Sequence, residues 1–342
     1  MKRIDIENGR WSYKGNVYYT QKEIEDWYIG TVYDDIHKRL QISEGFTLCE
    51  KTVLKCIDKR LKDILLASPQ KLETYKRYYS CLKRGLSCDK AYYEKQRDKD
   101  GNKKPSRYTV FRDHLLDVFG YEKRFRGSVL RELGNRLNVK TCPYCNLHYT
   151  LCIEDFNSKD ALELMTKFQF DHFIDKAEFP ILSMSLYNLI PSCPTCNQGK
   201  SQEPLSLEFH PYFSDICNTF KFAVKDPTKL YEGGEQTDEE IELVETSDVE
   251  VATYDRVFHI KKLYMRHKDI MQDIFARAYE EKYYGEKENF GFIQNQDLSR
   301  RVRIGFFPDE KDINMRPMTK FQQDLWEQAQ GDFGLFSSIF KK

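Results

Sequence analysis

Several features are missing from this 342-residue sequence. No apolar run approaches the roughly 18 residues of a membrane-spanning helix, and the opening residues MKRIDIENGR lack the apolar stretch of a signal peptide. Internal repeats, low-complexity tracts and Gly-rich phosphate-binding loops are absent too. These absences argue against a membrane protein, a repeat array and a self-contained ATPase. We therefore expect a soluble cytoplasmic protein with no membrane partner, whose 40% hydrophobic residues can form two or three domain cores.

The chain has ten cysteines and shows no export signal, so we expect it to be in a reducing compartment. Cytosolic thiols stay reduced, which argues against a disulfide framework. Metal binding is the better interpretation for any cysteines that pair at short spacing.

The net charge is zero, but the charges are segregated along the chain. Residues 76–107 hold eleven Lys or Arg against four Asp or Glu, whereas residues 232–250 hold nine acidic residues and no basic one. A polyanion could therefore meet one face of a neutral protein and avoid another.

The hydrophobic pattern predicts an α+β protein that is predominantly α. Residues 1–19 suggest a short hairpin or extended arm, and residues 20–97 an α-helical region capped at Thr20. The remaining predicted elements are an exposed loop at Asp98–Ser106, helices at Val110–Phe119 and Gly127–Leu137, strands at Phe220–Val224 and Ile241–Val244 around an acidic turn, a long helix from Val257 to Ala278, a strand at Val302–Phe307 and a last helix near Met318–Gln330. We accordingly divide the chain into a helical N-terminal domain (1–138), a metal-binding domain (139–214) and an α/β C-terminal extension (215–342).

Two Cys-x-x-Cys pairs, Cys142 with Cys145 and Cys193 with Cys196, provide the ligands of a tetrahedral zinc site. The 47 residues between the pairs exceed the usual gap of roughly 15–20, so the gap must contain structure. Cys-Pro-Tyr-Cys is also a redox motif of glutaredoxin-like proteins, but no βαβ pattern surrounds it here. A purely structural zinc module is the simplest alternative.

The stretch Phe168–Lys200 carries other residues that bind metals or move protons. A strand at Lys167–Asp175 would place the adjacent Asp171 and His172 on opposite faces unless the strand bends. Leu186–Ile190 would be the return strand, and Pro194 would begin a helix that carries Asn197 back toward Asp171.

This order of residues resembles the HNH endonucleases of the ββα-metal fold, in the zinc-bearing branch typified by phage resolvases of the endonuclease VII type. The resemblance covers about a fifth of the chain, Thr141–Tyr212. It implies that the four cysteines bind structural Zn²⁺, that Asp171 and Asn197 bind a catalytic Mg²⁺ or Mn²⁺, that His172 is the general base and that Asn188 keeps the histidine oriented. The substrate would be nucleic acid, with DNA preferred over RNA as the expectation. The long insertion before Asp171 departs from the family pattern.

Other residues keep two interpretations. Lys200 could hold a phosphate or be solvated, and His210 could contact the site or anchor a turn by packing. His148 could lie beside the zinc ligands. The basic segment before Cys142 could face phosphates or solvent, and the Tyr-rich N-terminal helices could bind nucleic acid or pack internally.

More loosely, the layout is similar to HNH subunits of bacterial anti-phage systems of the Septu and retron-effector types, which work beside an ATPase. The expected function is thus a metal-dependent endonuclease in anti-phage defence, with a separate ATPase subunit as a possible partner. The alternative is a non-catalytic, zinc-stabilised module that binds nucleic acid or a partner protein.

Overall fold

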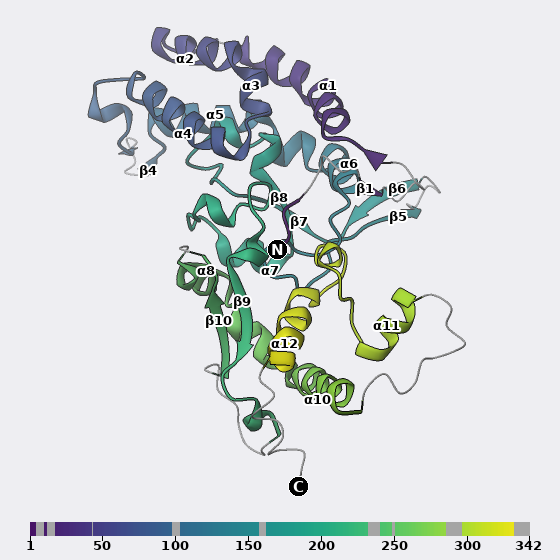
Figure 1. Cartoon of the computed structure of the whole chain (residues 1–342). Helices are drawn as coiled ribbons and strands as arrows, with labels where there is room; N and C mark the ends of the chain where they lie inside the picture. The colour runs from purple at the N-terminus through teal and green to yellow at the C-terminus, as the bar shows by residue number, and fades with distance from the viewer. Residues whose placement is uncertain are drawn as a thin grey trace.

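The computed structural model of the chain describes residues 1–4, 10–11, 18–42, 44–97, 103–156, 162–231, 240–247, 250–284 and 296–331. In these ranges the protein is mostly helical, with small two-stranded antiparallel sheets (Figure 1), as predicted. No helix in the described ranges has the length and apolar character that crossing a membrane requires.

The first part of the chain forms a helical body at the top of Figure 1. A short hairpin pairs β1 (Arg10–Trp11) with β2 (Tyr18–Tyr19), which confirms the predicted hairpin. The helices are α1 (Gln21–Leu40), α2 (Leu48–Lys59), α3 (Leu61–Leu65), α4 (Pro69–Arg84), α5 (Arg107–Phe119) and α6 (Ser128–Leu137). Thr20 and Glu23 form the capping box expected at the start of α1, and Thr47 and Glu50 form another at α2.

The middle of the chain holds two hairpins. β5 (Cys152–Phe156) pairs with β6 (Leu162–Thr166) inside the long gap between the Cys-x-x-Cys pairs, so the gap contains structure as predicted. β7 (Gln169–His172) pairs with β8 (Leu189–Ser192), with Asp171 opposite Ile190 and His172 opposite Leu189. The helix α7 (Pro194–Lys200) follows β8 directly and lies against β7.

The last part of the chain packs helices beside a further two-stranded sheet. β9 (Phe220–Val224) and β10 (Ile241–Glu245) pair antiparallel, as predicted, and the acidic turn at Gly233-Gly234 lies outside the described residues. The helices are α8 (Val251–Phe258), α9 (Ile260–Tyr264), α10 (Lys268–Tyr284), α11 (Gln296–Ile304) and α12 (Thr319–Gly331). One hydrophobic cluster runs from Met1 to Ala329, so the three predicted domains share a continuous core and their boundaries stay a prediction.

Four predicted elements need correction. The strand predicted at Val302–Phe307 is wrong: α11 covers its first half, because Arg-rich sequence with Leu298 and Val302 four residues apart favours a helix. The long helix from Val257 is broken at His259, whose φ of 52° is left-handed. The return strand begins at Leu189 instead of Leu186. The α-helical region predicted at residues 20–97 is interrupted after Arg84, where α4 ends before Gly85.

The predicted loop Asp98–Ser106 is described only in part. Residues 98–102 lie outside the described residues. Beside them, β4 (Lys103–Lys104) pairs with β3 (Gln96–Arg97), and Ser106 caps α5.

A four-cysteine metal centre and a basic cleft

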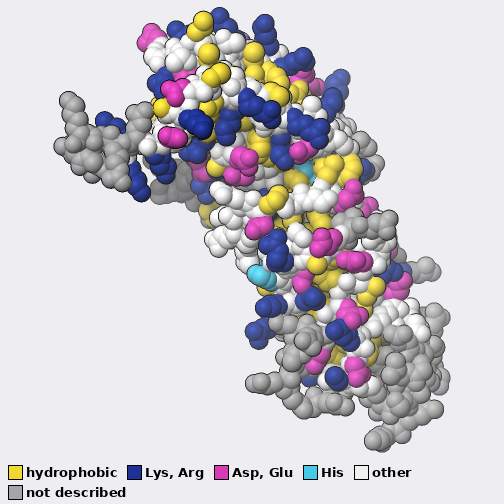
Figure 2. Space-filling view, turned by 90° about the vertical axis from the view of Figure 1, so that its left-hand side faces the viewer, with side chains coloured by type: hydrophobic (Ala, Val, Ile, Leu, Met, Phe, Trp, Pro, Cys, Tyr) yellow, Lys and Arg dark blue, Asp and Glu magenta, His cyan; other side chains and the backbone are white. Residues whose placement is uncertain are grey.

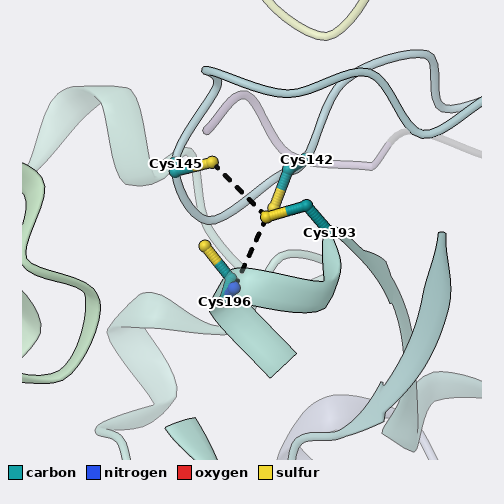
Figure 3. Close-up of side chains that lie close together, drawn as sticks. All are labelled: Cys142, Cys145, Cys193 and Cys196. Atoms are coloured by element: carbon teal, nitrogen blue, oxygen red, sulfur yellow. Dashed lines mark hydrogen bonds between the residues drawn. The ribbon is translucent and has the colours of Figure 1, made fainter. Parts of the chain in front are cut away.

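The four cysteines predicted to bind zinc come together. Their sulfur atoms lie within 4.8 Å of one another, and all four side chains are buried. Figure 3 shows the sulfurs turned toward a common centre, two from the loop after α6 and two from the start of α7. A Zn–S bond of about 2.3 Å puts the sulfurs of a zinc tetrahedron about 3.8 Å apart, close to the 3.9 Å between Cys145 and Cys193. The cluster could therefore hold a metal ion such as zinc.

The four thiols influence one another's protonation: the pKa values of Cys145 and Cys196 are raised, mainly by hydrogen bonds from the other thiols. Hydrogen bonds from Cys142 and Cys145 lower the pKa of the Cys193 thiol. His148 lies beside the cluster, with Nδ1 3.7 Å from the Cys145 sulfur, and the Cys193 sulfur raises its pKa. His148 therefore occupies the place beside the ligands that the sequence suggested.

Tyr144 connects the cysteine cluster to the second candidate site. It lies between Cys142 and Cys145, and its hydroxyl donates a 2.7 Å hydrogen bond to Oδ2 of Asp171. On the other side, α7 carries Cys193 and Cys196 at its start and Asn197 and Lys200 directly after them. A metal held by the cysteines would thus fix both the strand and the helix that carry the site.

Asp171 is buried beside Lys200, a charged group that is buried as well. The Lys200 ammonium lies 3.4 Å from Oδ2 of Asp171 and donates a 2.8 Å hydrogen bond to the backbone carbonyl of His172. Burial raises the pKa of Asp171, whereas Lys200 and the Tyr144 hydroxyl act in the opposite direction. Each carboxylate oxygen has two lone pairs, so these contacts leave acceptor capacity for a cation.

Lys200 is thus neither the phosphate contact nor the solvated side chain that the sequence suggested. Its side chain is 1% exposed, and its ammonium faces the Asp171 carboxylate. The helix that begins at Pro194 is only seven residues long. Its sequence pattern did not show that the side chain of Lys200 points into the protein.

His172 is held from two directions. Its Nε2 lies 3.0 Å from the carbonyl oxygen of Ser183, and the Tyr121 ring packs edge-on at 4.4 Å. A carbonyl can only accept a hydrogen bond, so Nε2 carries the proton and Nδ1 keeps its lone pair. In the described part of the chain no residue donates to Nδ1. Burial, and next the Lys176 ammonium, lower the pKa of His172 to about 3, so the ring is neutral at pH 7.

Asn188 ties together the loop that separates the two strands. Its side chain bonds both the N–H and the carbonyl of Ile174, at 2.7 and 3.0 Å, and also bonds the carbonyl of Leu182. Leu182 precedes Ser183, the partner of His172. Asn188 therefore lies in a position that fits the orienting role implied by the resemblance.

Asn197 reaches β7 from the first turn of α7. Its Nδ2 donates a 2.6 Å hydrogen bond to Oε1 of Gln169, two residues before Asp171. Within the described residues its Oδ1 has no hydrogen-bond donor. The four cysteines are also the only described group of three or more His, Cys, Asp or Glu side chains placed to share an ion, so an ion at Asp171 would rely on the Asn197 amide, water and substrate for its other ligands.

Asp171, His172 and Asn197 line one open cleft of about 790 Å³. The predicted separation of Asp171 and His172 onto opposite faces therefore does not stop both from reaching the same space. Four cations line the cleft as well: Lys123, Arg126, Arg131 and Lys176. Three of them belong to the basic segment before Cys142, whose phosphate-facing interpretation this placement favours.

The cleft cations are partly neutralised. Glu122 binds both Arg126, at 2.8 Å, and Lys176, while Lys123 pairs with Asp117 at 2.8 Å. Lys176 also lies 4.3 Å from the centre of the Tyr121 ring, which holds it beside His172. A phosphate entering the cleft would compete with Glu122 for the two cations.

His210 lies apart from this cleft. Its side chain is fully buried, it packs on the Phe173 ring at 4.2 Å, and its Nδ1 accepts a hydrogen bond from the backbone N–H of Tyr212. The structure thus brings His210 into the packed turn that the sequence offered as an alternative, and does not place it among the cleft residues.

Sequence reasoning missed four site residues: Tyr121, Tyr144, Gln169 and Lys176. Gln169 could have been found, because it is two residues from Asp171 and shares its side of the strand. Tyr121 precedes Asp171 by 50 residues in the sequence, and no local pattern indicates that it contacts His172. Comparison of the chain with protein-family models, with curated proteins and with solved structures gave no match.

Proposed function

We propose that the protein is a metal-dependent endonuclease of the HNH type, in which β7, β8 and α7 form the ββα-metal core. The observation that supports this most strongly is the shared cleft: a neutral histidine with a free Nδ1, a carboxylate and an amide oxygen lie together among four cations. These are the groups that hydrolysis of a phosphodiester bond requires.

In this mechanism His172 takes a proton from the attacking water through Nδ1. The Ser183 carbonyl holds the protonated Nε2 in place, and the ring of Tyr121 prevents the imidazole from turning. Asp171 and the Oδ1 of Asn197 would hold Mg²⁺ or Mn²⁺, oxygen-preferring ions that offset the charge developing on the phosphate and leaving oxygen. Lys176 and Arg126 would hold the flanking phosphates.

The substrate class follows from the charges. Four Lys or Arg in an open cleft fit a polyanion, and we propose DNA as the substrate and bacterial anti-phage defence as the setting. The described residues contain no ATP-binding loop, so any control by ATP would come from a separate ATPase subunit.

The decisive experiment is cleavage of plasmid DNA and of RNA with Mg²⁺, with Mn²⁺ or with EDTA, alone and with a candidate ATPase partner. We expect His172→Ala to lower metal-dependent cleavage by about 10² to 10⁴ fold, because it removes the general base, while the protein stays folded and keeps its zinc content. His267→Ala is the control, because His267 is half-buried in the C-terminal part of the chain and does not line the cleft.

Two results would overturn the proposal. Full cleavage by His172→Ala would remove the catalytic assignment. The alternative, a non-catalytic zinc module, predicts that the protein still functions after Asp171→Ala and Asn197→Ala. It also predicts that the metal bound by the cysteines is the only metal detected.

A further inference from the structure

The exposed face of α4 carries cations that are unpaired within the described part of the chain. Lys71, Arg77 and Arg84 are exposed, and in the described part of the chain none of them makes a hydrogen bond or an ion pair through its side chain. The single acidic residue of α4, Glu73, is paired with Lys76 at 2.9 Å. Five Lys or Arg against one Glu give this helix a net charge of +4 in a protein whose total charge is zero.

This face belongs to a larger basic surface. Figure 2 shows the Lys and Arg side chains gathered over the helical body, on the side of the molecule where α4 lies in Figure 1. The tyrosines of α4 do not offer free ring faces on which bases could stack. Tyr79 is buried, and Tyr75 packs against Tyr78 edge to face at 6.1 Å. Charge is therefore what this surface offers to a partner.

Another side of α4 borders a hollow that adjoins the cleft. This second hollow, of about 330 Å³, is lined on one side by Leu72 and Lys76 of α4. On the other side it is lined by Asp175 and Gln202, which also line the cleft. The ammonium of Lys76 lies 5.5 Å from the centre of the Phe179 ring, so α4 is packed directly on the loop that follows β7.

We propose that α4 binds the phosphate backbone of the same nucleic acid that enters the cleft, through Arg77 and Arg84. This rests on the proposed function. The two arginines are seven residues apart on one helix face, about 10 Å along its axis, and both can bind phosphate oxygens. The hollow between α4 and the cleft contains Glu73, Glu178 and Glu203, so the backbone runs along its rim and not through it.

The test is the salt dependence of binding. Duplex DNA, single-stranded DNA and single-stranded RNA oligonucleotides of equal length are titrated with His172→Ala protein, which does not cut them. Arg77→Ala with Arg84→Ala should weaken binding and reduce the slope of log Kd against log salt by about 1.8 for a duplex, or by about 1.4 for a single strand, because each lost phosphate contact removes about 0.9 or 0.7. The oligonucleotide whose slope falls by its expected value identifies the form of nucleic acid that α4 contacts.

The matched control is Arg266→Ala with Arg300→Ala. These arginines are also exposed and unpaired among the described residues, but they lie in the C-terminal part of the chain. The control should leave the slope unchanged. An α4 variant with the parental slope on every oligonucleotide would overturn the proposal and leave α4 as a surface for something other than nucleic acid.

A failure of the proposed function is recognised separately. Hydrolysis of bis(p-nitrophenyl) phosphate, which is too small to reach α4, reports only on His172 and the metal. The α4 variant should keep this activity in full. Loss of this hydrolysis in the α4 variant would mean that the helix supports the cleft structurally, and would also overturn the proposal.

Discussion

At the scale of single residues, the site is built from side chains that burial holds in one chemical state. His172 is neutral because its ring is buried, and Asp171 keeps a counter-charge because Lys200 lies beneath it. A buried carboxylate without a partner would protonate. The Lys200 ammonium thus favours the ionised form of the buried Asp171 carboxylate, which is the form that can bind a cation.

His210 gives a pH dependence of stability that can be measured without an activity assay. Burial lowers its pKa to about 3, whereas an unfolded histidine titrates near 6.5. Between these values the unfolded chain takes up a proton that folded His210 does not, so stability falls as the pH falls, by up to about 1.4 kcal/mol per pH unit. His210→Asn removes this proton while its amide can still accept from the Tyr212 N–H.

The measurement is urea unfolding at several pH values between about 4 and 6. We expect the slope of unfolding free energy against pH to be smaller in His210→Asn by up to about 1.4 kcal/mol per unit. Any packing loss would shift the whole curve and leave its slope alone. Parallel curves for the two proteins would show that His210 is not held neutral by burial.

The identity of the metal and proton-transfer candidates could be read from the sequence, because their spacing is local. Two Cys-x-x-Cys pairs and the Asp171-His172 pair are short patterns of residue types that can be recognised without knowledge of the rest of the fold. The inward direction of Lys200 and the contact of Tyr121 with His172 depend on packing between distant segments. No periodicity in the sequence reports such contacts.

At the scale of elements, Glu50 clips α2 to α5. Its carboxylate is fully buried and accepts two hydrogen bonds from the Arg107 guanidinium, at 2.8 and 2.6 Å, and one from the Tyr92 hydroxyl at 2.7 Å. Burial raises the pKa of Glu50, but the hydrogen bonds from Arg107, Thr47 and Tyr92 outweigh it and hold the pKa below its ordinary value. The same side chain also closes the capping box at the start of α2.

Removing the arginine should therefore be costly. Arg107→Ala leaves the Glu50 charge buried without its main partner, and we expect a loss of about 3 kcal/mol in the free energy of unfolding at pH 7. Arg112→Ala is the control, because Arg112 pairs with its exposed neighbour Asp113 and should cost less than about 1 kcal/mol. If the urea midpoints of the two variants fell by the same amount, the contact between Glu50 and Arg107 would not be important for stability.

Elements with strong periodicity or clear caps were predictable. The capping box at Thr20 set the start of α1, and the alternation of Phe220 and Phe222 with polar neighbours set β9. The break at His259 was not predictable, because the apolar spacing continues across it and the interruption is a single left-handed residue. In α11 the short run of apolar residues was compatible with a strand or a helix, and the Arg-rich sequence around Leu298 and Val302 favours the helix.

At the scale of the whole molecule, the cysteine cluster joins the site to the C-terminal helices. The hydroxyl of Tyr254 in α8 donates to the carbonyl of Tyr144, and that of Tyr264 in α9 donates to the carbonyl of Cys145 at 2.6 Å. Asn146 continues the connection, because its Oδ1 accepts from the N–H of Lys320 in α12. The loop that carries two of the four cysteines is thus the point where the middle and the end of the chain meet.

Loss of a metal at this point should loosen α8 and α9 as well as the cleft. Cys145→Ser removes one of four thiolate ligands, so we expect the chain to lose its tightly bound zinc, to unfold at a lower temperature and to exchange amide hydrogens faster in α8 and α9. Cys217→Ser is the control, because Cys217 is a buried cysteine outside the cluster and its replacement should leave one zinc per chain. Zinc content by elemental analysis separates metal loss from a simple packing defect. If both variants keep their zinc, or if chelation of the parent protein leaves α8 and α9 protected from exchange, then the cysteines do not hold the metal that stabilises this junction.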